Sequence, residues 1–187
     1  MKLKKIPTFI DDLFIIEHSV FNDNRGWFTE IYNKKDFEEI NINVDFVQDN
    51  LSLSNKNVLR GIHFQTVHSQ AKLIKILQGK VLDIAVDLRK ESKTFGKYVS
   101  IELNSNENKM LFIPKNFGHG FLALEDNTIL FYKCDDYYFK EHDGGIIYND
   151  VDLNINWCRD GFKPIFNPII SSKDLQLQTF KDWNNNV

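Results

Sequence analysis

Two of the five histidines in this sequence stand in surroundings that suggest chemistry. His63 lies in the segment V-L-R-G-I-H-F-Q, and His119 ends the pattern P-x-x-x-G-H in the segment I-P-K-N-F-G-H-G-F-L. Histidine gains or loses a proton near neutral pH, which suits it to acid–base catalysis and, when neutral, to metal binding. A histidine in a strand is more often a hydrogen-bonded structural residue, so these segments alone leave both interpretations open.

Metal binding is disfavoured by what surrounds these histidines. The His119 segment resembles the second motif of cupin barrels, but the first motif of metal-binding cupins supplies H-x-H and a glutamate. Here the first segment reads His63-Phe64-Gln65. A catalytic metal usually needs three protein ligands, and His68 should lie on the opposite face of a straight strand from His63. The sequence therefore predicts no metal.

Alternation of apolar and polar residues predicts the strands that must position these side chains. The pattern has a period of two in residues 81–87, 98–103 and 128–133, which is typical of pleated strands. Further strands are expected at residues 73–77 and 120–124. Short turn clusters separate them, which favours an antiparallel β-sandwich or barrel. The sequence has neither G-x-G-x-x-G nor G-x-x-x-x-G-K-S/T, so Rossmann and P-loop enzymes are disfavoured.

Two short helices are predicted outside the strands. Residues 34–40 follow Asn33, and residues 173–180 follow Ser171 closely. Asn and Ser are favourable N-cap residues, because their side chains accept hydrogen bonds from the first free backbone N–H groups.

Composition predicts a single domain over residues 1–187 with a sizeable core, since 42% of the residues are hydrophobic and 16 are phenylalanine. The net charge is −3 and the basic residues are scattered, which disfavours nucleic-acid binding. Cys134 and Cys158 lack metal-binding spacing and are expected to be reduced thiols. No segment approaches the roughly 20 apolar residues of a membrane helix. The N-terminal apolar stretch is broken by Asp11 and Asp12, so we expect a cytoplasmic protein without a signal peptide.

Segments spread almost from end to end resemble the dTDP-4-dehydrorhamnose 3,5-epimerase family. In order, they read D-N-R-G-W-F-T-E, V-Q-D-N, V-L-R-G-I-H-F-Q, Q-A-K-L-I-K-I-L-Q-G-K-V-L-D-I-A-V-D-L-R, F-G-K-Y, I-P-K-N-F-G-H-G-F-L, F-Y-K-C-D-D-Y-Y, Y-N-D and S-S-K-D. The resemblance implies an all-β, cupin-like jelly roll with short peripheral helices. It also implies a cofactor-independent isomerase, a dTDP-sugar substrate, and a homodimer in which strands of one chain complete the sheet of the other.

The implied reaction inverts C3 and C5 of dTDP-4-keto-6-deoxy-D-glucose to give dTDP-4-keto-L-rhamnose, in dTDP-L-rhamnose biosynthesis. Inversion beside a ketone needs a base, stabilisation of the enolate, and an acid on the opposite face. By resemblance, His63 is the base and Asp174 orients it as a dyad. Tyr132 is the acid, and Lys72, which should sit at a strand end, stabilises the enolate.

The resemblance also assigns the residues that bind the substrate. The cations for the nucleotide are Arg25, Arg60 and Lys173, and we rank Arg60 first because it lies three residues from His63. Tyr138 matches the aromatic residue that stacks on thymine, and His119 is expected near the diphosphate or sugar. The polar contacts are Glu30, Gln48, Asn50 and Asp143.

The sequence departs from the family around D-G-G-I-I-Y-N-D. Asp143 replaces the usual glutamate, Tyr148 replaces a tryptophan, and Gly144 and Ile147 replace arginines. The stretch 158–167 also looks longer than usual. These changes concern the sugar-nucleotide periphery rather than the expected base and acid.

Three alternatives remain open from the sequence. The first is an epimerase that inverts only one carbon, or acts on a related 4-keto sugar nucleotide, because the same base and acid serve either reaction. The second is a metal-dependent cupin oxygenase or isomerase, which the missing H-x-H disfavours. The third is a sugar-binding cupin without catalysis, which would need no acid opposite a base.

Overall fold

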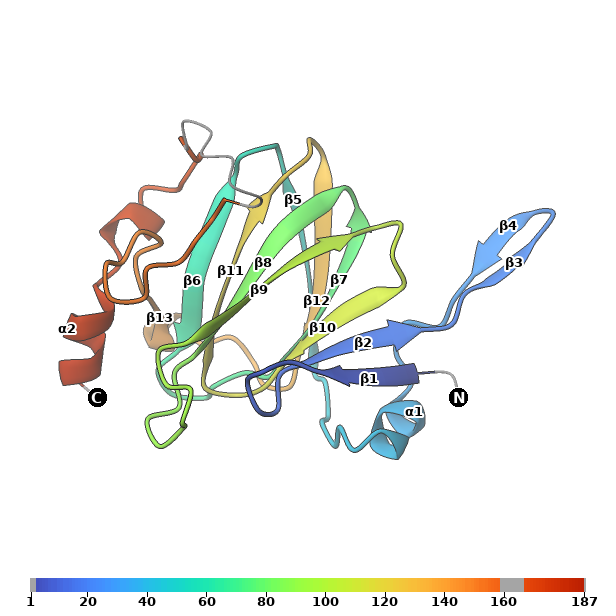
Figure 1. Ribbon diagram of the computed structural model, residues 1–187, viewed down its shortest axis with the longest axis horizontal. Helices are drawn as coiled ribbons and strands as arrows, with labels where there is room; N and C mark the ends of the chain where they lie inside the picture. Colours follow the sequence, from blue (N-terminus) through green and yellow to red (C-terminus); the bar gives the residue numbers. More distant parts are fainter. Residues whose placement is uncertain (1–2, 159–166, 187) are drawn as a thin grey trace.

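Two antiparallel β-sheets face each other in the computed structural model, which describes residues 3–158 and 167–186 (Figure 1). Within these residues, sheet I has six strands, ordered β1 (Leu3–Pro7), β2 (Phe14–His18), β10 (Lys109–Ile113), β7 (Lys72–Gln78), β12 (Thr128–Cys134) and β5 (Gln48–Ser54). Sheet II has five described strands, ordered β13 (Asp143–Gly145), β6 (Leu59–Gln65), β11 (Phe117–Ala123), β8 (Lys80–Asp87) and β9 (Tyr98–Asn104). This arrangement is a cupin-like jelly roll, so the predicted all-β fold is confirmed.

The main core lies between the sheets. Ile74, Leu111 and Leu130 of sheet I pack against Val81 and Phe121 of sheet II, and all five are buried. Two further apolar clusters cover outer faces of the sheets. One packs against sheet II and includes Trp157 and Trp183, whereas the other packs against sheet I and includes Phe37 and Ile40. The sheets are therefore held by packing on both faces, which fixes the space left between them.

The predicted strands are all present, with bounds that differ by a few residues. In β8, alternation of apolar and polar residues did not predict burial correctly. Every position from Val81 to Asp87 is buried, including Asp83 and Asp87. β11 begins at Phe117, so His119 lies within the strand rather than ahead of it. Carboxylates on a strand that is covered on both sides need internal partners, and both find them.

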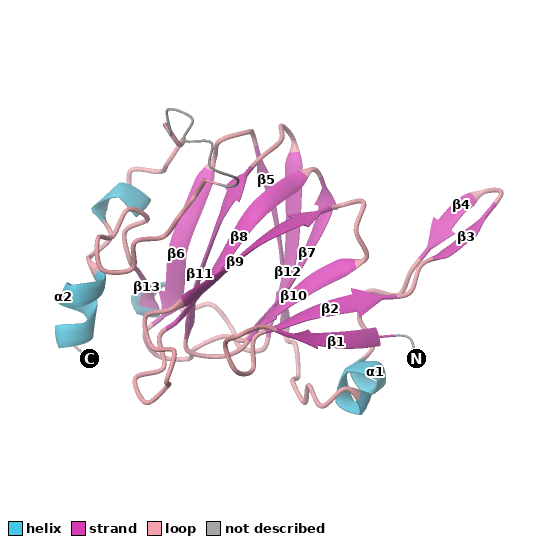
Figure 2. Cartoon of the chain, in the orientation of Figure 1, coloured by secondary structure: helices cyan, strands magenta, loops and turns pink. Residues whose placement is uncertain are grey.

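The helices lie at the periphery (Figure 2). α1 (Lys34–Glu39) is confirmed, and the Asn33 side chain accepts a hydrogen bond from the Lys35 N–H as expected. The helix predicted at residues 173–180 is wrong. That segment contains only the 3₁₀ turn η2 (Asp174–Gln176), and α2 (Phe180–Asn185) starts at the end of it. A second 3₁₀ turn, η1 (Lys140–His142), precedes β13.

Competing contacts explain the error at residues 173–180. Gln178 forms an isolated bridge with Ile146, and its carbonyl accepts a hydrogen bond from the Ile147 N–H. This pairing holds the chain extended between η2 and α2. Thr179 then caps α2, because its side chain accepts a hydrogen bond from the Asp182 N–H.

β3 (Phe21–Asp23) and β4 (Gly26–Phe28) form a hairpin that projects from the body, and we call residues 21–28 the arm (Figure 1). Its apolar residues are uncovered: the exposed fractions are 59% for Phe21, 70% for Trp27 and 68% for Phe28. None of the helices within residues 3–158 and 167–186 is long and apolar enough to cross a membrane. Cys134 and Cys158 are both free thiols, as expected.

Asp87 should contribute to stability through its charge. Its buried carboxylate accepts hydrogen bonds from the Arg89 guanidinium and the hydroxyls of Ser92 and Thr94. Burial alone would raise the pKa of Asp87, but these bonds lower it from 3.8 to about 2. We expect Asp87→Asn to reduce the free energy of unfolding at pH 7 by about 2 kcal/mol, because the ionised form is favoured in the folded state.

The sign of the pH dependence follows from the lowered pKa. The contribution of Asp87 is present above its unfolded pKa and is lost as the pH falls through its folded pKa. In urea unfolding, the difference in the free energy of unfolding between wild type and Asp87→Asn should therefore become smaller as the pH falls from about 5 to about 3. Asp12→Asn is the control, because Asp12 pairs with the same Arg89 from an exposed position and should change the free energy of unfolding much less. A gap that is constant with pH would contradict this account.

Candidate active site

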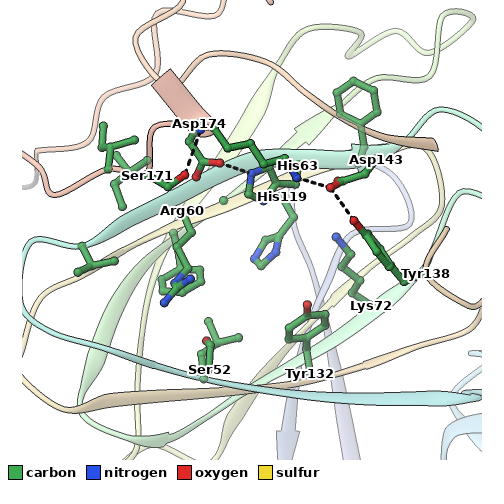
Figure 3. Close-up of a pocket in the computed structure, with 18 of the residues that line it drawn as sticks. Ser52, Arg60, His63, Lys72, His119, Tyr132, Tyr138, Asp143, Ser171 and Asp174 are labelled. Atoms are coloured by element: carbon green, nitrogen blue, oxygen red, sulfur yellow. Dashed lines mark hydrogen bonds and ion pairs between the residues drawn. The ribbon is translucent and has the colours of Figure 1, made fainter. Parts of the chain in front are cut away.

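A cavity of about 580 Å³ opens between the two sheets (Figure 3). Nine of the residues predicted for the site line it, within the part of the chain that the structure describes: Arg60, His63, Lys72, His119, Tyr132, Tyr138, Asp143, Lys173 and Asp174. They come from both sheets, from the loop that contains Tyr138 and from the segment around η2. The fold thus gathers most of the predicted site into one place.

His63 and Asp174 form the expected hydrogen bond. His63 Nε2 and Asp174 Oδ1 are 2.9 Å apart, although 111 residues separate them in the chain. Burial opposes ionisation of Asp174, but its hydrogen bonds to His63, Gly61 and Ser171 lower its pKa. An ionised carboxylate only accepts hydrogen bonds, so Nε2 carries the hydrogen and Nδ1 keeps a lone pair that can take a proton.

Two hydrogen bonds hold Asp174 in place, one to its carboxylate and one from its backbone N–H. The Gly61 N–H donates to Asp174 Oδ2 at 3.3 Å, and the Asp174 N–H donates to Ser171 Oγ at 3.1 Å. Asp174 is 4% exposed, whereas the His63 side chain is one-third exposed toward the cavity. The dyad therefore has a buried carboxylate and an accessible imidazole.

His119 lies beside His63, because the two residues are direct partners in the pairing of β11 with β6. His119 Nε2 is 3.0 and 3.1 Å from the carboxylate oxygens of Asp83, which is fully buried in β8. Sequence reasoning missed Asp83. The signal was a carboxylate in an otherwise apolar strand, where a buried charge calls for a partner.

Lys72 and Tyr132 stand on the opposite wall, on β7 and β12 of sheet I. Tyr132 pairs with Ile74, two residues along from Lys72, so the two side chains are diagonal neighbours on one face. Lys72 is the first residue of β7, as expected. Burial lowers the pKa of Lys72 and raises that of Tyr132 to about 12, so the phenol keeps its proton at neutral pH.

The arrangement places a base and an acid on facing walls. Figure 3 shows His63 and Asp174 on one side of the cavity and Tyr132 on the other. The sheet order agrees, since β6 belongs to sheet II and β12 to sheet I. A flat intermediate held between the walls could lose a proton on one face and gain one on the other.

Tyr138, Asp143 and Lys173 meet at another part of the cavity. The Tyr138 hydroxyl donates to Asp143 Oδ2 at 2.9 Å, and the Lys173 ammonium forms an ion pair with the same oxygen. The hydrogen bond to Asp143 raises the pKa of both Tyr138 and Lys173. Asp143 thus joins an aromatic ring and a cation, even though its side chain is one methylene shorter than the glutamate expected from the family pattern.

Arg60 contacts the C-terminal end of β5, whereas Gln48 and Asn50 lie toward its N-terminal end. The Arg60 guanidinium donates to Ser54 Oγ at 3.2 Å and to the Leu53 carbonyl at 3.3 Å. Gln48 and Asn50 are hydrogen-bonded to each other beside the cavity, and Gln48 accepts from the Tyr138 N–H at 3.0 Å. Gln48 and Asn50 therefore border the cavity without lining it, whereas Arg60 lines it.

Arg25 and Glu30 are not brought to this cavity. Arg25 lies on the arm, with its side chain 85% exposed and paired with Asp23, and Glu30 follows the arm. Figure 1 shows the arm extending away from sheet II. Within one chain, these two predicted residues thus lie apart from the nine that line the cavity.

The described residues contain no group of three or more His, Cys, Asp or Glu side chains that could hold a metal ion. His68 does not share a strand with His63, because β6 ends at Gln65. It instead stacks on Phe139, with ring centroids 4.5 Å apart. Of the departures from the family pattern, Tyr148 packs against the outer core of sheet II, and most of the stretch 158–167 lies outside the described residues.

Comparison with known proteins adds to this geometry. A family model described as dTDP-4-dehydrorhamnose 3,5-epimerase matches residues 7–182. The Shigella flexneri protein of the same description is 44% identical over 179 residues, which cover 95% of this chain and 96% of that protein.

Two solved structures are similar over nearly their full length. The dTDP-4-dehydrorhamnose 3,5-epimerase of Elizabethkingia anophelis NUHP1 is 45% identical, with a TM-score of 0.90, and the match covers 98% of this chain and all of that one. The 3,5-epimerase of Legionella pneumophila in complex with dTDP-4-keto-L-rhamnose is 40% identical, with a TM-score of 0.89 and coverage of 96% and 93%.

Proposed function

The chain belongs to the dTDP-4-dehydrorhamnose 3,5-epimerase family, and we propose that it converts dTDP-4-keto-6-deoxy-D-glucose to dTDP-4-keto-L-rhamnose. The reaction inverts C3 and C5, the two carbons beside the ketone, and belongs to dTDP-L-rhamnose biosynthesis. The observation that carries the proposal is the pair of facing walls, with His63 and Asp174 on one and Tyr132 on the other.

In this reaction His63 takes the proton from the carbon beside the ketone. The hydrogen bond from Nε2 to Asp174 supports this role, because it leaves the Nδ1 lone pair as the acceptor and stabilises the imidazolium that forms. Loss of the proton leaves an enolate, whose negative charge develops on the former keto oxygen. The Lys72 ammonium offsets that charge from sheet I.

Tyr132 completes each inversion by returning a proton from the opposite face. Its raised pKa keeps the hydroxyl protonated until the enolate carbon accepts the proton. Afterwards Tyr132 regains a proton from water and His63 releases one, so the enzyme is restored. C3 and C5 flank the same ketone, and so one base, one acid and one enolate-stabilising lysine can serve both carbons in turn.

The remaining cavity residues suit the nucleotide part of the substrate. Arg60 and Lys173 provide positive charge for the diphosphate. The ring of Tyr138 offers a face for the thymine base, and Asp143 holds that ring by its hydroxyl. Gln48, Asn50 and His119 supply polar contacts around these groups.

We also propose that the protein is a homodimer, in which the arm of one chain reaches the cavity of the other. The exposed Phe21, Trp27 and Phe28 support this, because such an apolar hairpin is poorly stable in water alone. Arg25 and Glu30 would then join the substrate in the partner's cavity. The proposal thus accounts for the two predicted residues that lie away from the cavity of their own chain.

The proposal includes a cytoplasmic protein whose 187 residues act as one domain, without a cofactor and without nucleic-acid or membrane partners. The free thiols of Cys134 and Cys158 agree with a reducing compartment. The proton transfers described above use only side chains of this chain, so they require no metal.

Exchange with heavy water tests the assignment of base and acid. Wild type should introduce deuterium at C3 and C5 of dTDP-4-keto-6-deoxy-D-glucose, as followed by NMR, whereas label at one carbon alone would favour the single-carbon epimerase. His63→Ala should lose exchange and inversion by at least about 100-fold, since no enolate forms. Tyr132→Phe should still exchange, with configuration retained, because His63 can return a proton on its own face.

Two further variants complete that experiment. Lys72→Ala should slow exchange and inversion together, because both pass through the enolate. Tyr98→Phe is the matched control, since Tyr98 lies on β9 and does not line the cavity. If Tyr132→Phe inverts the substrate at the wild-type rate, Tyr132 is not the acid.

Mixed dimers test the arm. Arg25→Ala and His63→Ala chains should each be poorly active alone at low substrate concentration. When they are unfolded together and refolded, half of the dimers combine the two chains, and one site in each has both residues intact. Activity should recover to about a quarter of wild type. A mixture of His63→Ala with Asp174→Asn is the control and should not recover, because both residues belong to one cavity. Failure of the first mixture to recover would place Arg25 outside the partner's site.

Chelation tests the cofactor proposal. Dialysis against EDTA should leave the wild-type rate unchanged, because proton transfer by His63 and Tyr132 needs no metal. Metal analysis of the dialysed protein provides the control that any bound ion was removed. Loss of activity that one added divalent ion restores would overturn the proposal.

A further inference from the structure

The side chains of β5 are arranged opposite to the usual pattern of a sheet that covers a core. Alternate residues of a strand share a face. Leu51 and Leu53 point outward and are 65% and 58% exposed. The opposite face carries only polar side chains, namely Gln48, Asn50, Ser52 and Ser54. A polar row facing inward beside the cavity calls for an account of what each member contacts.

Three members of the row have partners within the protein. Gln48 donates to Asn50 at 2.9 Å and accepts from the Tyr138 N–H at 3.0 Å. Asn50 Nδ2 also lies 3.7 Å from Cys134 Sγ. Ser54 Oγ accepts from Arg60 Nε at 3.2 Å. These contacts satisfy the polar groups of Gln48, Asn50 and Ser54 and hold their side chains in place.

Ser52 is the exception. Its Oγ is buried and has no hydrogen-bond partner within residues 3–158 and 167–186. Ser52 also lines the cavity. A buried hydroxyl without a hydrogen-bond partner lowers the stability of the folded protein. A ligand that provided a partner for Ser52 Oγ would therefore gain a hydrogen bond without breaking one within the protein.

The neighbours of Ser52 indicate which part of a ligand would meet it. Ser52 pairs with Leu130, two residues before Tyr132 on β12, so its side chain is diagonal to that of Tyr132. On the other side, Arg60 is bonded to Ser54 and to the Leu53 carbonyl. Figure 3 shows Ser52 across the cavity from His63, with Arg60 and Tyr132 nearest to it among the labelled residues. Ser52 therefore lies between a cation for the diphosphate and the acid for the reacting carbons.

We propose that Ser52 Oγ binds the sugar hydroxyl on C2, the carbon between the diphosphate-bearing C1 and the reacting C3. The inference rests on the proposed function, which places the diphosphate near Arg60 and C3 near Tyr132. A serine hydroxyl suits this role because it can donate to, or accept from, another hydroxyl. The contact would hold C3 at a fixed distance from Tyr132, so Ser52 is a positioning residue for the sugar ring.

Ser52→Ala separates this role from a structural one, because the two predict different effects on stability. Removal of an unpartnered buried hydroxyl should leave the melting temperature of the unliganded protein unchanged or raise it. The same change should lower kcat/KM for the keto sugar nucleotide about three- to tenfold, the loss expected for one neutral hydrogen bond. Ser100→Ala is the matched control, since Ser100 is an exposed serine on β9. A lower melting temperature with unchanged kcat/KM would overturn the inference.

The ligand atom is tested with two nucleotide sugars and calorimetric binding. Wild type should bind dTDP-glucose about three- to tenfold more tightly than Ser52→Ala does. Wild type and Ser52→Ala should have the same affinity for dTDP alone. They should also have the same affinity for dTDP-2-deoxyglucose, because it lacks the C2 hydroxyl. An equal loss with dTDP alone would assign the contact to the diphosphate and would overturn the inference.

The binding measurements keep the two proposals apart. If wild type fails to exchange substrate protons in heavy water, the proposed function fails. The Ser52 inference then stands or falls on the dTDP-glucose comparison, which requires no turnover. If exchange occurs and Ser52→Ala binds all three ligands like wild type, only the Ser52 inference fails.

Discussion

The hydrogen bond between His63 and Asp174 connects parts of the chain that are 111 residues apart. Asp174 can reach His63 only if the part of the chain that follows the core strands returns to sheet II and places η2 beside β6. Packing provides for that return, because Trp157, Trp183 and Ile146 cover the outer face of the sheet. The Gly61 N–H then donates to the Asp174 carboxylate, and Ser171 Oγ accepts from the Asp174 backbone N–H, so that the carboxylate lies within hydrogen-bond distance of the imidazole. Two residues far apart in the sequence are thus brought into a directional hydrogen bond.

The two-sheet architecture solves a geometric problem of the chemistry. Inversion needs a base and an acid on opposite faces of a flat enolate, and neighbouring residues of one strand cannot provide them at the necessary separation. Here His63 and His119 project from sheet II, and Lys72 and Tyr132 from sheet I. The buried core between Ile74, Leu130 and Phe121 fixes the distance between the sheets. Rigid walls of this kind hold the reacting groups better than loops would.

The sequence predicted the strands well, because the alternation of residues 81–87 or 98–103 is a local property of the pleated chain. It predicted the dyad only through the family resemblance, since no local pattern links His63 to Asp174. Asp83 was missed because a polar residue in an alternating strand suggests solvent, whereas sheet I covers this face. The helix at 173–180 was misplaced because the bridge between Gln178 and Ile146 is a tertiary contact. The placement of Arg25 on a projecting arm also depends on the folded chain rather than on its motif.

The polar groups of the cavity impose a cost that the rest of the fold must offset. Lys72 loses hydration, as its lowered pKa indicates, and Ser52 Oγ is buried without a hydrogen-bond partner in the part of the chain that the structure describes. Apolar residues at these positions would pack against the neighbouring core and stabilise the unliganded protein. The polar side chains are instead kept where two sheets, both packed on their outer faces, can tolerate them. Residues that are unfavourable for folding at a cavity wall, yet surrounded by well-packed apolar clusters, mark the places where sequence is constrained by ligand binding rather than by stability.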